Sequence, residues 1–330
     1  MRDRRLALLL VTLLALASLF VATSCGGGGT NAPAPEPTVT AANVPGVPAI
    51  GGVQIFPANN PWNTDISHYR LDPHSAAYIN SIGAGTGLHP DFGTVWEGVP
   101  IGMSFLVVPG TQKKVRMVFD DPSQSDPGPY PFPANAPIEG GATSTGDRHV
   151  LVLDTGNKIL YETWSSYPQA NGSWHCGSGA KFDLTRNKLR PDYWTSADAA
   201  GLPILPGLVR YDEVQAGAIH HALRFTVQHT QQAFIHPATH YASSITDPTV
   251  PPMGLRLRLK ASYVIPSNYP ACAKVVLQAL KKYGMIVADN GSNWFISGEH
   301  NMKWSDDNLG YLKLVAGSNF EAVYTGPIIK

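Results

Sequence analysis

The chain has 330 residues, with 24 basic and 24 acidic side chains, 43% hydrophobic residues, 32 glycines, 28 prolines and 3 cysteines. Its length suits one large domain or two small ones. Because the charge is balanced, with no basic stripe and no aromatic RNA-binding motif, nucleic acid is excluded as an expected partner.

The first 24 residues have the pattern of a signal peptide. Basic residues are followed by the apolar stretch 6–20 and by small residues directly before Cys25. A cysteine at this point resembles a bacterial lipobox, so we expect 1–24 to be a lipoprotein signal peptide and Cys25 to carry lipid. An ordinary signal peptide or an N-terminal membrane anchor is the alternative. The lipid would attach an exported protein to the bacterial cell envelope, in the periplasm or at the cell surface.

Residues 25–50 consist largely of Gly, Ala, Thr and Pro, which predicts a flexible spacer that cannot bury a core. Residues 51–330 contain no linker and no internal repeat, which predicts a single globular domain. Its short alternating segments, few helical patterns and many Gly and Pro residues predict a mainly β fold, a sandwich or jelly roll with a few short helices.

In the first half, Asp72 and Pro73 predict the start of a short helix over 72–82. Segments 99–108 and 114–119 have strand patterns, and the Pro/Gly-rich stretch 121–142 predicts a long loop, either functional or a rigid cover over an open sheet end. Residues 146–164 predict a β-hairpin with its turn at 154–157.

In the second half, Ser196 is the expected N-cap of a short helix over 197–200. The remaining elements follow in chain order: a helical turn at 211–214, strands over 219–227 and 255–260 (the latter with its basic side facing solvent), a helix over 270–283 ended by Gly284, strands at 285–288 and 294–296, a helix over 306–314 capped by Ser305, and a strand at 320–324.

The predicted hairpin register places His149 directly opposite Glu162, and this pair is the strongest indication of acid–base chemistry. A structural cross-strand hydrogen bond is the alternative. Other candidates for the same chemistry occur near the strand 219–227, where His221 is also a candidate core histidine. The predicted catalytic residues are His149, Glu162, Asp212, His220, His221 and Arg224. Asp154, Asp192 and Asp289 are assigned to turns instead.

Aromatic and histidine residues in nearby loops predict a ligand-binding surface that could stack against sugar rings, although buried core positions are the alternative. The predicted ligand-binding residues are Trp174, His175, Tyr193, Trp194 and Tyr241, and Trp164 is a further aromatic residue beside these loops. No metal site or cofactor is expected, since His236 and His240 are separated by Pro237 and no metal or phosphate-loop motif is present. Cys176 and Cys272 either pair, as an exported compartment permits, or remain separate buried thiols.

Several segments, including GDRHVLVLD, SADAAGLPILPGLVRYDEV and IHHALRFTV, resemble a family of exported bacterial proteins without an established activity. The resemblance implies export and a single domain, and it assigns no role to any residue. Two functions therefore stay open: a cell-envelope lipoprotein that binds or cleaves an extracellular carbohydrate as a glycoside hydrolase or polysaccharide lyase, or a non-catalytic binding or scaffold protein.

Overall fold

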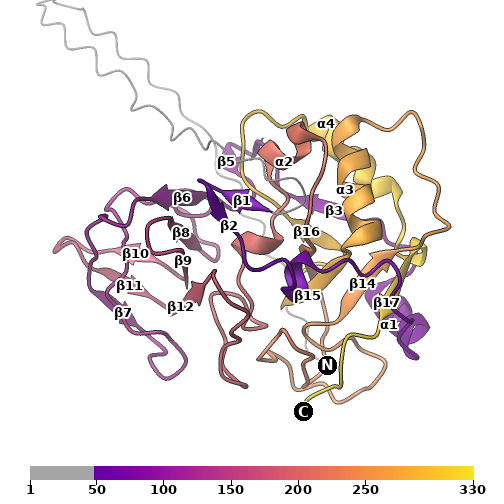
Figure 1. Ribbon diagram of the computed structural model, residues 1–330, viewed down its shortest axis with the longest axis horizontal. Helices are drawn as coiled ribbons and strands as arrows, with labels where there is room; N and C mark the ends of the chain where they lie inside the picture. The colour runs from indigo at the N-terminus through magenta and orange to yellow at the C-terminus, as the bar shows by residue number, and fades with distance from the viewer. Residues whose placement is uncertain (1–47) are drawn as a thin grey trace, which may run out of the picture. The chain divides into compact units, whose positions relative to one another are not determined.

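The computed structural model describes residues 48–330, and the predicted signal peptide, the predicted lipidation site Cys25 and most of the predicted spacer lie outside this range. The described chain is mainly β, with several sheets and a few short helices (Figure 1). A strand already forms at Ala49–Ile50, just before the predicted start of the domain. Within 48–330, every helix is too short or too polar to span a membrane.

The largest sheet has six strands in the order β17-β14-β15-β13-β16-β3. Its members are β3 (His89–Asp91), β13 (Leu223–Val227), β14 (Arg256–Leu259), β15 (Met285–Asn290), β16 (Phe295–Ser297) and β17 (Phe320–Val323). The pairs β13/β15 and β16/β3 are parallel and the other three are antiparallel. A jelly roll is antiparallel throughout, so these mixed pairings differ from that part of the sequence prediction.

A second sheet has four strands in the order β12-β9-β8-β6, and a third has three strands in the order β10-β11-β7. These strands are β6 (Phe105–Val108), β7 (Met117–Phe119), β8 (Val150–Asp154), β9 (Ile159–Trp164), β10 (Tyr167–Pro168), β11 (Trp174–Cys176) and β12 (Ser178–Asp183). Two further pairs are β1 (Ala49–Ile50) with β2 (Val53–Gln54), and β4 (Val95–Trp96) with β5 (Val99–Pro100).

The helices are α1 (Ser75–Ile82), α2 (Tyr211–Ala216), α3 (Ala271–Lys282) and α4 (Asp306–Leu309), with 3-10 turns η1 (Pro61–Asn63), η2 (Leu205–Gly207), η3 (Gly310–Leu314) and η4 (Gly317–Asn319). Figure 1 shows α3 lying against the six-stranded sheet. It buries Ala273, Val276, Leu277 and Leu280, the i, i+3, i+4, i+7 spacing of an amphipathic helix. This helix was predicted within two residues at each end.

The hairpin of β8 and β9 is present, but its predicted register is wrong. Asp154 pairs with Ile159 and Leu151 pairs with Glu162, so the connecting loop is 155–158 and His149 is not opposite Glu162. The Asp154 carboxylate accepts hydrogen bonds from the backbone N–H and side chain of Asn157, which closes the loop one residue later than expected. A shift in the loop moves every cross-strand pair of a hairpin.

The four-stranded sheet is buried on both faces, and every residue of β8 is buried. One face, with Leu151 and Leu160, shares a hydrophobic core with the six-stranded sheet. The other face is covered by Tyr130 and Phe132 of the Pro-rich loop, which pack with Val152 in a second core. The prolines of this loop have no N–H to donate, so the loop covers the sheet with side chains rather than adding a strand.

Three other local predictions were wrong. The predicted cap Asp72 only accepts a hydrogen bond from the His74 backbone, and α1 begins at Ser75. Residues 197–200 form a turn instead of a helix, because the Ser196 hydroxyl bonds to the backbone of Asp198. Arg256, expected to face solvent, is 3% exposed and donates to backbone carbonyls of Thr64 and Tyr283.

Two glycines with positive φ provide a matched test of backbone packing. Gly254 has φ +80°, and a Cβ there would lie 2.0 Å from the Ile235 carbonyl oxygen, whereas Gly217 has φ +88° with open space around it. We expect Gly217→Ala to cost about 1–2 kcal/mol from the left-handed backbone alone. Gly254→Ala should cost clearly more, measured by urea unfolding, and equal costs would contradict this packing.

Candidate functional site

A polar cavity of about 430 Å³ lies between the ends of the two larger sheets. We call it the central cavity. Its size is within the range of small-molecule sites. It is lined by six ionisable side chains, which come from the six-stranded sheet, from the Pro-rich loop and from the segment that leads into β8. These are Asp91, Glu139, Asp147, His149, Arg224 and Asp289.

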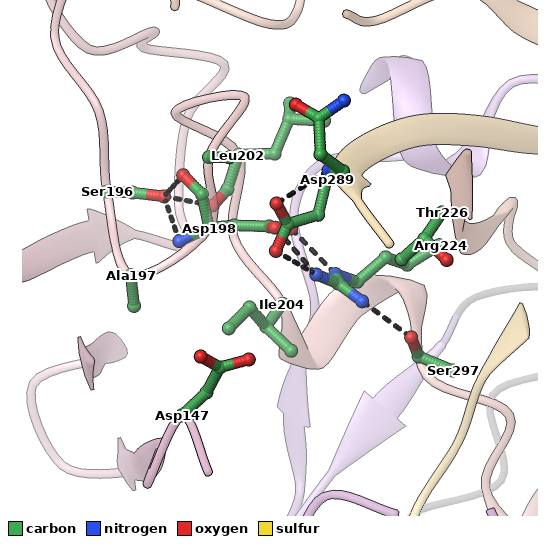
Figure 2. Close-up of polar contacts among 12 residues, drawn as sticks. Asp147, Ser196, Ala197, Asp198, Leu202, Ile204, Arg224, Thr226, Asp289 and Ser297 are labelled. Carbon is green, nitrogen blue, oxygen red and sulfur yellow. Dashed lines mark hydrogen bonds and ion pairs between the residues drawn. The ribbon is translucent and has the colours of Figure 1, made fainter. Parts of the chain in front are cut away.

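Arg224 of β13 organises one wall of this cavity. Its guanidinium donates to both carboxylate oxygens of Asp198, at 2.8 and 2.7 Å, and to the hydroxyl of Ser297 at 2.6 Å. Asp289 of β15 accepts a fourth hydrogen bond from this guanidinium at 3.1 Å. Figure 2 shows Arg224 held between these groups, with the Asp147 carboxylate on a separate segment pointing toward them.

His149 joins this wall to the Pro-rich loop. Its Nδ1 lies 2.6 Å from a Glu139 carboxylate oxygen, and its Nε2 lies 3.0 Å from the Ala197 carbonyl oxygen. Both partners only accept hydrogen bonds, so both ring nitrogens carry protons and His149 is an imidazolium cation. Its ring is therefore fixed as the partner of an ionised carboxylate and has no lone pair free to act as a base.

The environment drives the pKa values of the cavity carboxyls apart. Burial and the negative charge of Asp198 raise the pKa of Asp289 to about 6, against the opposing effect of Arg224. Burial would also raise the pKa of Glu139, but its hydrogen bonds with His149 outweigh that effect and lower it. For His149 itself, burial opposes the charged form, yet Glu139 raises its pKa to about 9. Carboxyls with opposite shifts in one site are typical of acid–base pairs.

Of the six predicted catalytic residues, only His149 and Arg224 line the central cavity. Glu162 is fully buried, and its two carboxylate oxygens accept the backbone N–H groups of Ile204 and Leu205 at 2.8 and 2.9 Å. These N–H groups begin η2 and have no partner inside that turn, so Glu162 caps it. Burial raises the pKa of Glu162 to about 7 despite these two hydrogen bonds.

The other three predicted catalytic residues lie outside the central cavity, near α2. Asp212 is 3.5 Å from Arg210. His221 is buried between the Ala222 carbonyl oxygen and Glu213, which agrees with the alternative that it is a core histidine. His220 packs edge-on against Tyr283. These three residues therefore do not form one site with His149, in contrast to the sequence prediction.

None of the five predicted ligand-binding residues lines the central cavity. Trp174 is 1% exposed and packs edge-on against Phe132 in the second core. The other four sit elsewhere on the domain: His175 hydrogen-bonds Asp120, Tyr193 and Tyr241 contact each other edge-on, and Trp194 lies beside Arg190.

Sequence reasoning missed Glu139, Asp198 and Asp289. The sequence predicts a turn at Asp289, which belongs to β15, and it predicts a helix at Asp198 that does not form. A usable signal existed for Glu139, because it is the only glutamate of the loop 121–142, whose length and composition already indicated a special role. Its partner could not be inferred, since ten residues and a change of direction separate it from His149.

Within residues 48–330, no three His, Cys, Asp or Glu side chains are grouped so as to hold a metal ion. Cys176 and Cys272 are both free thiols, so the alternative in which they pair is wrong. No family model, curated protein or solved structure matches this chain.

The His149–Glu139 pair predicts a pH-dependent part of the stability. Because the folded pKa of about 9 lies above the ordinary value of 6.5, the pair stabilises fully below about pH 6.5 and its contribution is lost as the pH rises through 9. That contribution is on the order of 3 kcal/mol. We expect Glu139→Gln to be much less stable than the native chain at pH 6.5, and the difference to shrink by pH 9.5.

Urea unfolding at a series of pH values measures this difference. Glu97→Gln serves as the control, because Glu97 is exposed and lies in a surface turn. A stability difference for Glu139→Gln that stays constant from pH 6.5 to 9.5 would show that His149 is not held as a cation.

Proposed function

We propose that this protein binds a carbohydrate in the central cavity and hydrolyses it by acid–base chemistry. The observation that carries the proposal is the pairing, in one cavity, of a carboxyl with a raised pKa, Asp289, and a carboxylate with a lowered pKa, Glu139. Glycoside hydrolysis uses two carboxyls in these two protonation states. Asp289 is then the general acid, and Glu139 is the ionised base or nucleophile.

The supporting residues have defined roles in this proposal. His149 positions Glu139 and keeps it ionised, and the Asp198 charge helps to keep Asp289 protonated. Arg224 fixes Asp289 in the cavity wall. Proton transfer by a positioned group of this kind contributes about 10²–10⁴-fold to a rate.

The charge of the cavity favours a neutral ligand over an acidic one. Four carboxyls, Asp91, Glu139, Asp147 and Asp289, line it, against the cations His149 and Arg224, which are already engaged by carboxylates. A polysaccharide lyase needs a free cation to neutralise a uronate carboxylate. Hydrolysis of a neutral sugar therefore fits this cavity better than elimination from an acidic one.

The sequence supplies the cellular setting of the proposal. The pattern of residues 1–24 and Cys25 indicates an exported lipoprotein held at the bacterial cell envelope. Residues 26–47 would serve as the spacer. A sandwich of the two larger sheets is the fold description we favour, because they share one hydrophobic core.

Binding without cleavage is the second candidate function, and one observation favours it. Both nitrogens of His149 and most donors of Arg224 are engaged within the protein, so the cavity wall is rigid and preorganised. Such a wall can present fixed hydrogen-bonding groups to a ligand without any proton transfer.

Replacement of the general acid tests the proposal. Release of reducing ends from neutral oligosaccharides should fall by about 10²-fold or more in Asp289→Asn, while Asp307→Asn, an exposed carboxyl on α4, leaves it unchanged. Because Asp289 must be protonated to act, kcat/KM should fall about tenfold per pH unit above about pH 6. Full activity in Asp289→Asn would remove this assignment, and binding with no product from the native chain would favour the second function.

A further inference from the structure

Two smaller cavities adjoin the central cavity and share lining residues with it. One, of about 360 Å³, contains Trp96 and shares Asp91 and Ile101 with the central cavity. The other, of about 350 Å³, contains Trp164 and shares four residues with it, among them Asp147 and Asp289. We call them the Trp96 cavity and the Trp164 cavity. Each of the two cavities that share residues with the acidic central cavity thus contains a tryptophan.

Trp96 lies next to the turn of a tight hairpin, and its side chain is exposed. It pairs with Val99 across β4 and β5, and the two turn residues between them, Glu97 and Gly98, have φ values of +50° and +80°. Positive φ at both central residues is the geometry of a type I′ turn, which fixes the direction of the strands. The side chain is 69% exposed, more than any other large aromatic residue of the described chain.

Trp164, at the end of β9, is fixed in a different way. Its indole N–H donates to the Asp147 carboxylate at 3.1 Å. Its ring lies against the backbone of Gly177, where an added Cβ would be 2.3 Å from a ring carbon. The residue still exposes 42% of its surface and lines its cavity. The hydrogen bond to Asp147 and the packing against Gly177 therefore hold the Trp164 ring at the cavity in one orientation.

The charges of these neighbours extend the acidic character of the central cavity. The Trp164 cavity adds Asp121 and Asp198, and the Trp96 cavity adds Asp306 together with Lys313. Acidic side chains outnumber cations over the whole series, so a polyanion would be repelled. Exposed aromatic faces stack on the C–H faces of sugar rings, and the carboxylates accept hydrogen bonds from hydroxyl groups.

We propose that the Trp96 and Trp164 cavities are binding subsites for neighbouring sugar units of a neutral oligosaccharide whose middle unit occupies the central cavity. The proposal rests on the proposed function and deepens it, because it makes the ligand at least three units long. Cleavage in the central cavity would then fall within the glycan chain, away from its ends.

The test is the dependence of affinity on ligand length. The full chain is titrated with cello-, malto-, xylo- and N-acetylchito-oligosaccharides of one to six units, followed by tryptophan fluorescence and calorimetry. In at least one series, Kd should fall tenfold or more from one unit to three or four and change little beyond. Oligogalacturonates of the same lengths should bind at least tenfold more weakly.

Variants of the two tryptophans separate the subsites from the central cavity. Trp96→Ala and Trp164→Ala should each weaken tetrasaccharide binding about tenfold and leave monosaccharide binding within twofold, while Trp96→Phe and Trp164→Phe, which keep an aromatic face, retain most of the affinity. Leu314→Ala is the control, since Leu314 is 66% exposed and lines none of the three cavities. Circular dichroism verifies that each variant is folded.

The outcomes that overturn the inference differ from those that overturn the proposed function. Binding of a monosaccharide as tight as that of a tetrasaccharide, native affinity in both alanine variants, or stronger binding of oligogalacturonates would each reject the subsites and leave carbohydrate binding in the central cavity intact. Absence of binding to every series would reject both proposals.

Discussion

The buried ion pair between Arg224 and Asp198 determines how the candidate site is assembled. Arg224 belongs to the six-stranded sheet, and Asp198 belongs to the segment between the four-stranded sheet and η2. The carbonyl of the preceding residue, Ala197, accepts the hydrogen bond of His149, which enters the four-stranded sheet. One short segment thus connects both sheets through charged groups. Removal of one partner of such a pair typically costs 3–5 kcal/mol, because the other charge stays buried and unpaired.

The same network contributes to the opposite pKa shifts of two cavity carboxyls, Asp289 and Glu139. Asp289 shares Arg224 with the fully buried Asp198, and burial together with the negative charge of Asp198 raises the pKa of Asp289. Glu139 has a cation of its own in His149 and remains ionised. A low local dielectric enlarges both effects, since each charge is weakly screened by water. The opposite pKa shifts of Asp289 and Glu139 thus come from burial together with the sharing of two cations among three carboxyls.

The Pro-rich loop has two functions in the structure. Its aromatic residues Tyr130 and Phe132 complete the second core, which anchors the loop on the four-stranded sheet. Nine prolines and glycines between residues 121 and 142 restrict or redirect the backbone, and the loop then brings Glu139 to His149. The alternatives of a functional loop and a rigid cover are thus compatible, because the cover is what fixes the position of the carboxylate.

The sequence by itself determined the mainly β class, the hairpin, the strands of the second half, helix α3 and the Ser305 cap, because their signals are local: alternation, periodicity and capping. It also selected His149 and Arg224, which both line the central cavity. Only the tertiary structure decided their partners. His149 contacts Glu139 of the Pro-rich loop, and Arg224 contacts Asp198 of a turn and Asp289 of a parallel strand. Glu162 lies outside the site because its carboxylate caps η2. Contacts between distant segments depend on register and loop geometry, and a one-residue shift in the hairpin turn changed every predicted pair.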